Sequence, residues 1–117
     1  MKTPLDPRHK KREALVKKLF SYGFQPNQPA KTIQPIIKKL KKIDHLISQS
    51  APEWPLEKLN RIDLAILRLA VYELLAGENP QKVIIDEAVE LGKHFGSDSS
   101  SKFVNGVLGT ILDELKK

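Results

Sequence analysis

The sequence of 117 residues contains no cysteine. This absence excludes a disulfide framework, a thiol nucleophile and a cysteine-ligated zinc site. Long apolar runs are also missing, because none approaches the roughly 18 residues of a membrane span. The charged start, MKTPLDPRHKK, has no apolar segment behind it. We therefore expect a cytoplasmic protein with no membrane segment and no cleaved leader.

Signals for β-strands and for common catalytic motifs are equally scarce. No segment shows a sustained alternation of apolar and polar residues, and Asn105-Gly106 lies inside a helical pattern. There is no glycine-rich phosphate-binding loop and no histidine pair at metal-binding spacing. The serines of 97–101 lack a base that the sequence places beside them, and we interpret them as helix caps. We expect an all-α protein that is not an enzyme, with no catalytic residues, no metal site and no cofactor.

The composition is that of one small soluble domain, which we place at residues 1–117. Hydrophobic residues make up 40% and charged residues 29%, a balance that can bury a modest core. The net charge of +6 is unevenly distributed: residues 1–50 carry +9 and residues 51–117 carry −3. A basic half of this kind is typical of nucleic-acid binding and also of a solvated lysine-rich surface. Composition does not separate these two interpretations.

The basic half is predicted to form two helices. Asp6 and Pro7 are typical of a helix start, and the first helix is expected from about 8 to 22, with Gly23 ending it. The five residues RHKKR at 8–12 surround this helix axis, so we expect all of them to project into water or onto a ligand. Apolar spacing predicts a second, continuous helix from Ile33 to near Ser50. Its lysines 38, 39, 41 and 42 lie largely off the apolar stripe, which favours a solvated face over a phosphate contact.

The second half, residues 51–117, is predicted to be a bundle around one central helix. A short helical turn at 56–59 precedes Asn60, which has the position of a cap, with the Asp63 carboxylate returning to the cap backbone. The central helix follows to 76 and ends at Gly77. Two more helices are expected, one at 83–95 and one after the serines of 97–101. In the last helix, Gly106 and Gly109 would permit close approach of a neighbour.

Three segments of this half carry a family resemblance. NRIDLAILRLAVYELL, KVIIDEAVELGKHFG and SKFVNGVL occur in that order, and over residues 54–115 the sequence resembles the NusB family of transcription antitermination proteins. The first helix, with its basic start, agrees in kind with that family. The region at 24–50 is shorter than is usual in the family. The resemblance thus implies a helical bundle of NusB type with a shortened N-terminal half.

The resemblance also implies a function and a set of residues. It implies an RNA-binding protein that pairs with the ribosomal protein NusE, recognises boxA-type RNA on ribosomal transcripts and acts on the RNA polymerase elongation complex to suppress termination. The residues that match RNA-binding positions of the family are Arg8, His9, Lys10, Lys11, Arg12, Lys102 and Phe103. The residues that match partner-binding positions are Phe20, Glu57 and Asp63.

Several alternatives stay open at this point. Phe103 has the helical spacing of a core residue as well as the position of a base-stacking ring, and Asp63 has a capping role as well as a partner-binding position. Two other functions compete with antitermination. One is the NusB-like RNA-binding appendage of an RNA methyltransferase, which the short length opposes. The other is a structural helical homodimer, formed through an apolar surface that the shortened half leaves uncovered.

Overall fold

The computed structural model describes residues 6–117. They form α1 (Pro7–Phe24), η1 (Lys31–Ile33), α2 (Gln34–Lys38), α3 (Leu40–Ser50), η2 (Leu56–Lys58), α4 (Arg61–Ala76), α5 (Gln81–Phe95) and α6 (Asp98–Leu115). No strand occurs within 6–117, which confirms the all-α prediction. No helix in this range is long and apolar enough to cross a membrane. The expectation of no cleaved leader rests partly on residues 1–5, which lie outside the described residues.

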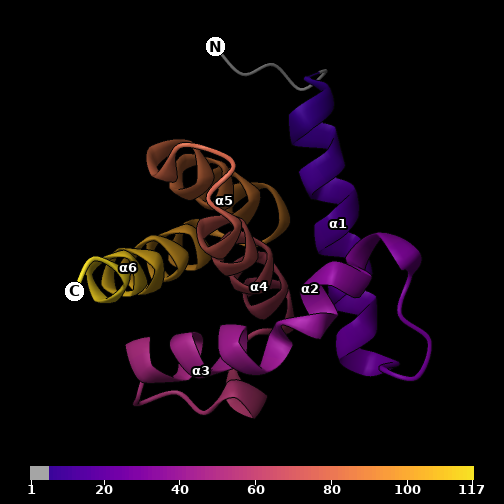
Figure 1. The fold of residues 1–117 in the computed structure, drawn as a ribbon, viewed down its shortest axis with the longest axis horizontal. Helices are drawn as coiled ribbons and strands as arrows, with labels where there is room; N and C mark the ends of the chain where they lie inside the picture. Colours follow the sequence, from indigo (N-terminus) through magenta and orange to yellow (C-terminus); the bar gives the residue numbers. More distant parts are fainter. Residues whose placement is uncertain (1–5) are drawn as a thin grey trace.

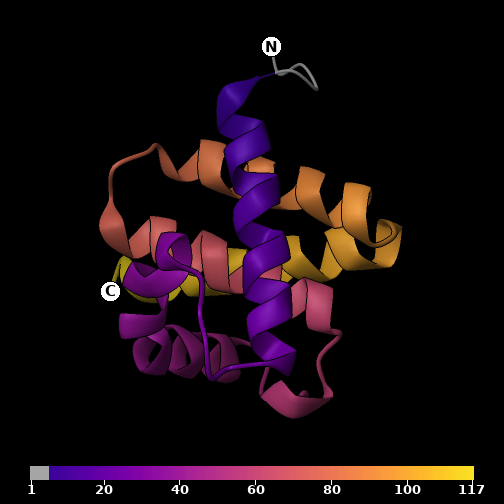
Figure 2. The same cartoon turned by 90° about the vertical axis from the view of Figure 1, so that its right-hand side faces the viewer.

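Helix α4 lies at the centre of the fold. Figure 1 shows α1 on one side of it and α5 and α6 on the other, with α3 alongside, and all four helices contact it. In the turned view of Figure 2, α1 crosses α4 steeply. The side chains of Ile66, Leu67 and Val71 are fully buried, since apolar residues cover more than half of the helix circumference. The prediction of a surrounded central helix is confirmed.

Local signals place both ends of α4 correctly, whereas α5 and α6 begin earlier than predicted, at Gln81 and Asp98. Asn60 Oδ1 accepts hydrogen bonds from the backbone N–H groups of Ile62 (2.9 Å) and Asp63 (3.2 Å). Gly77 ends α4 in the left-handed conformation, with φ of 69°, which glycine adopts without a steric penalty. The Ser97 side chain caps α6. The predicted turn at 56–59 is present as η2.

The predicted helix ends in the basic half are less accurate. Helix α1 runs through Gly23 to Phe24 and is followed by Gln25. The predicted continuous helix from Ile33 is instead divided into η1, α2 and α3, with a break at Lys39. There the Lys39 N–H donates to the carbonyl of Ile36 at 3.0 Å, a three-residue bond that tightens and ends a helix. The apolar spacing across 33–47 is equally compatible with an unbroken helix, so it does not reveal the break.

The close approach of two helices occurs at a different glycine from the predicted pair. A Cβ atom added at Gly106 or Gly109 would meet no atom within 4 Å, so the prediction for these glycines is wrong. At Gly92 of α5, an added Cβ would lie 3.1 Å from the Cα atom of Ser101 in α6. Gly92 is therefore the residue that lets α5 and α6 pack backbone against backbone.

Candidate nucleic-acid interface

The five charged residues at the start of α1 divide into two sets. Arg8, Lys10 and Lys11 are exposed, whereas His9 is half-buried and Arg12 is buried. The prediction that all five project from the fold is therefore wrong for His9 and Arg12. We call the exposed set, Arg8, Lys10 and Lys11, the cationic arm.

Arg12 is held by carboxylates from two other helices. Its Nη2 atom lies 2.7 Å from Glu73 Oε1 of α4 and its Nε atom 3.0 Å from Glu73 Oε2, while its Nη1 atom lies 3.8 Å from Glu87 Oε1 of α5. The hydrogen bonds to Glu73 raise the pKa of Arg12, and the charges of Glu73 and Glu87 add to this effect, against the lowering by burial. These counter-charges come from helices distant in the sequence, so the sequence of α1 alone does not reveal them.

His9 contacts Glu87 as well. Its Nε2 atom lies 2.9 Å from Glu13 Oε1, and its Nδ1 atom lies 3.0 Å from Glu87 Oε2. Together, His9 and Arg12 fasten the start of α1 to α4 and α5. These two residues therefore position the arm, and the three exposed residues are the ones that can meet a ligand.

The cationic arm borders a groove of about 230 Å³ between α1, α2 and the end of α4. Arg8 and Lys11 line it together with Tyr72. Glu73 and Glu78 also line it; the Glu73 carboxylate is engaged by Arg12, and Glu78 is exposed. The Arg8 side chain is 84% exposed and has one weak ion pair, 3.5 Å from Asp6 Oδ2. The groove can thus admit an anionic group beside the arm.

Lys102 and Phe103, the other predicted RNA-binding residues, lie in a separate groove of about 370 Å³. Lys102 is exposed, whereas Phe103 is partly buried and packs against the core. Trp54, which is 54% exposed, lines the same groove. Phe103 therefore supports the core and also lines a groove, and its base-stacking role stays a prediction. Sequence reasoning passed over Trp54, although a lone tryptophan in the break SAPEWP was the available signal.

The predicted partner residues lie in different environments. Phe20 is 37% exposed, and its ring meets that of Phe24 edge to face, with centroids 5.1 Å apart. Helical spacing places Phe20 on the same face as the buried Val16 and Leu19, but the structure leaves its ring partly exposed. Glu57 is exposed in η2, while Asp63 is buried in the first turn of α4. Phe20, Phe24 and Glu57 are accessible to a protein, and Asp63 is not.

Comparison with known proteins identifies the family of this chain. The family model described as "NusB family" matches residues 30–113. The chain belongs to the NusB family. Transcription antitermination protein NusB of Lysinibacillus sphaericus is 39% identical over 92% of this chain and 98% of its own length. The T. maritima NusB structure superposes with a TM-score of 0.83 at 37% identity, covering 97% of this chain and 94% of that one.

Other NusB relatives match over a shorter part of their length. Transcription antitermination protein NusB of Herpetosiphon aurantiacus is 49% identical over 62% of this chain and 53% of its own length. The chain thus spans about half the length of that relative. The match to the NusB family confirms the family that the three sequence segments indicated.

Asp63 is a buried carboxylate with an unsatisfied atom. Its Oδ1 atom has no hydrogen-bond partner, and no hydrogen bond joins the carboxylate to the Asn60 backbone within the described residues. The predicted return of Asp63 to the cap is therefore wrong. Burial raises the pKa of Asp63, and a hydrogen bond with Ser100 of α6 acts in the opposite direction. The net result is a pKa above the ordinary value of 3.8.

This raised pKa predicts that Asp63→Asn stabilises the NusB fold at neutral pH. The folded state holds the Asp63 proton more tightly than the unfolded state. The protonated carboxyl therefore makes its full contribution to the free energy of unfolding at pH values below the unfolded pKa. This contribution is lost as the pH rises through the folded pKa. Each unit of difference corresponds to about 1.4 kcal/mol. Urea unfolding should therefore show an advantage of the asparagine variant at neutral pH that disappears in acid.

Asp98→Asn is the matched control for this measurement. Asp98 also lies in the first turn of a helix, but it is exposed. There the helix dipole favours the charged carboxylate by roughly 0.3–1 kcal/mol. The control should lose stability at neutral pH, and the same loss in Asp63→Asn would show that the charge of Asp63 is stabilised rather than penalised.

Proposed function

We propose that this chain is a transcription antitermination factor that binds boxA-type RNA together with the ribosomal protein NusE and so acts on the RNA polymerase elongation complex. The observation that carries the proposal is the cationic arm, whose three charges have little compensation and stand at one end of a NusB-family fold. A cationic group on an ordered helix attracts phosphates through Coulomb steering and counterion release.

The accessible residues suit different parts of an RNA, according to their chemistry. Arg8 can bind a phosphate in a bidentate fork or stack on a base, whereas Lys10 and Lys11 act as point charges. Phe103 and Trp54 offer ring surface beside Lys102 for an unpaired base. His9 and Arg12, which the family pattern assigns to RNA, here hold the arm in place through carboxylates.

The partner side of the proposal rests on accessible aromatic and acidic residues. Phe20 and Phe24 expose ring surface on α1, and Glu57 is exposed in η2. Aromatic side chains are enriched at the buried centres of protein interfaces. An exposed acidic group such as Glu57 suits a basic ribosomal protein such as NusE.

RNA titration of the arm variant Arg8→Gln/Lys11→Gln tests this proposal. If three arm residues contact phosphates, they contribute about −2 to the slope of log affinity against log salt, and the variant should lose about 1.4 of that slope. Because both residues are exposed, unfolding stability should change by about 0.5 kcal/mol or less. Addition of NusE should tighten RNA binding, and RNA should tighten NusE binding by the same factor.

Lys17→Gln/Lys18→Gln is the matched control, because these neighbouring lysines of α1 are also exposed and lie outside the arm. This control should keep the wild-type salt slope. A wild-type affinity that does not respond to salt, or a NusE effect of zero, contradicts the proposal.

A further inference from the structure

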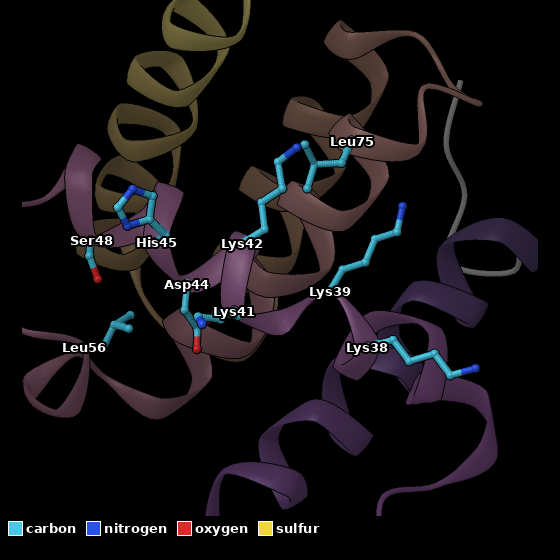
Figure 3. Close-up of a pocket in the computed structure, with 9 residues that line it drawn as sticks. All are labelled: Lys38, Lys39, Lys41, Lys42, Asp44, His45, Ser48, Leu56 and Leu75. Carbon is cyan, nitrogen blue, oxygen red and sulfur yellow. The ribbon is translucent and has the colours of Figure 1, made fainter.

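A groove lined by lysines lies on the opposite side of α2 from the cationic arm. It has a volume of about 730 Å³ and opens between α2, α3 and the last turn of α4. We call it the lysine groove and define it by Lys38, Lys39, Lys41 and Lys42, with Asp44 and Leu75 (Figure 3). All four lysines are exposed.

The positive charge of this groove is not compensated by its own residues. Asp44 is the one carboxylate that lines it. That carboxylate is bound in a bidentate fork by Arg68 of α4, with Nε to Oδ1 and Nη2 to Oδ2 both at 2.9 Å. Among residues 6–117, no carboxylate lies within ion-pair distance of any of the four lysines. The groove therefore presents four free positive charges to solvent.

The break between α2 and α3 distributes these charges over two helices and the turn between them. Lys38 ends α2, Lys39 lies in the break, and Lys41 and Lys42 stand in the first turn of α3. Figure 3 shows Lys39 and Lys42 extending toward the end of α4, where Leu75 lies, and Lys38 extending away from them. The four ammonium groups are thus spread over the surface, as contacts to a chain of separate charges require.

The lysine groove and the groove of the cationic arm are both lined by residues of α2 and α4. The arm groove is lined by Ile36 of α2 and Ala76 of α4, and the lysine groove by their near neighbours Lys38 and Leu75. The two basic surfaces are therefore separated by the width of α2 and the last turn of α4. A flexible polyanion that lies along the arm can continue across this ridge into the lysine groove.

We propose that the lysine groove binds the phosphodiester backbone of RNA as a second contact, continuous with the arm. This inference rests on the proposed function, because the arm supplies the first contact. Lysine ammonium groups act as point charges suited to phosphates, and the lining holds four of them beside the imidazole ring of His45. The contact is therefore independent of RNA sequence and engages only an RNA long enough to reach it.

The test compares Lys39→Gln/Lys42→Gln with wild type on a short and a long single-stranded RNA. With the long RNA, the loss of two phosphate contacts should make the slope of log affinity against log salt shallower by about 1.4. With the short RNA, bound by the arm alone, the variant and wild type should agree. The arm variant Arg8→Gln/Lys11→Gln should lose affinity for both RNAs.

The control Lys17→Gln/Lys18→Gln removes the same charge from exposed neighbouring lysines that line neither groove. If wild type binds both RNAs and the lysine-groove variant behaves like this control, the inference fails and the proposed function stands. If wild type binds neither RNA, the proposed function fails and the inference falls with it. Vesicles of anionic lipid are a second probe, and lysine-dependent binding to them without an effect on the long RNA also overturns the inference.

Discussion

Replacing Arg12 with alanine should destabilise this protein by about 3–5 kcal/mol, the usual effect of removing one partner from a buried ion pair. The Arg12 side chain is 10% exposed and lies against Glu73 and Glu87, whose side chains are 16% and 6% exposed. Without Arg12, the largely buried Glu73 carboxylate loses its bidentate partner, and Glu87 loses one of its positively charged neighbours. Since small domains have total stabilities of roughly 5–15 kcal/mol, urea unfolding should show a large shift of the midpoint.

Two variants make this expectation specific to the ion pair. Arg8→Ala, four residues earlier on the same helix, removes an exposed side chain and should change stability by about 0.5 kcal/mol or less. Glu73→Gln should be less harmful in the Arg12→Ala background than in wild type, because it removes a carboxylate that has already lost its partner. Equal stabilities of the Arg8 and Arg12 variants would mean that the arginine at 12 is not packed.

The second large effect on the free energy of unfolding is expected from truncation of Leu67 to alanine. Leu67 is fully buried on the central helix α4, and Leu69 on the same helix is 2% exposed. Removing such a side chain loses its transfer free energy and leaves a cavity, together about 2–5 kcal/mol. Thermal and urea unfolding of Leu67→Ala and of Leu69→Ala should both show this loss.

Leu115→Ala is the control for the core variants, because this leucine in the last turn of α6 is 37% exposed. Its loss of stability should be much smaller than that of either α4 variant. Melting of both α4 variants at the wild-type temperature would place α4 at the surface and contradict the architecture.

Features that depend on near neighbours in the chain could be predicted from the sequence. The start of α4 is encoded by Asn60, whose side chain bonds to backbone groups two and three residues later, and its end by Gly77. The same holds for Ser97 at the start of α6. Apolar spacing likewise identified α4 as the central helix, because a helix that is apolar over most of its circumference needs neighbours on several sides.

Features that depend on distant residues could not be predicted in the same way. Arg12 and Glu73 are 61 residues apart, and nothing in the local pattern shows that they meet. The approach of α5 to α6 at Gly92 depends on the position of Ser101 in another helix. The choice between Gly92 and the pair Gly106 and Gly109 therefore requires the packing itself.

The candidate site was predicted in outline only. The family resemblance identified the start of α1, but it did not divide the exposed Arg8, Lys10 and Lys11 from the anchored His9 and Arg12. The neutralisation of Asp44 by Arg68, 24 residues away, is likewise invisible in the sequence. Without it, the lysines beside Asp44 are indistinguishable from an ordinary solvated face.

The anchoring of α1 by His9 and Arg12 has a consequence for the entropy of ligand binding. In proteins most helical stability comes from tertiary packing, and here the first turns of α1 are fastened to α4 and α5 before any ligand arrives. A ligand of the arm then restricts only side-chain rotamers and avoids the roughly 1–2 kcal/mol per residue of ordering a backbone. Association requires no coil-to-helix transition, so diffusion and charge set its rate rather than folding.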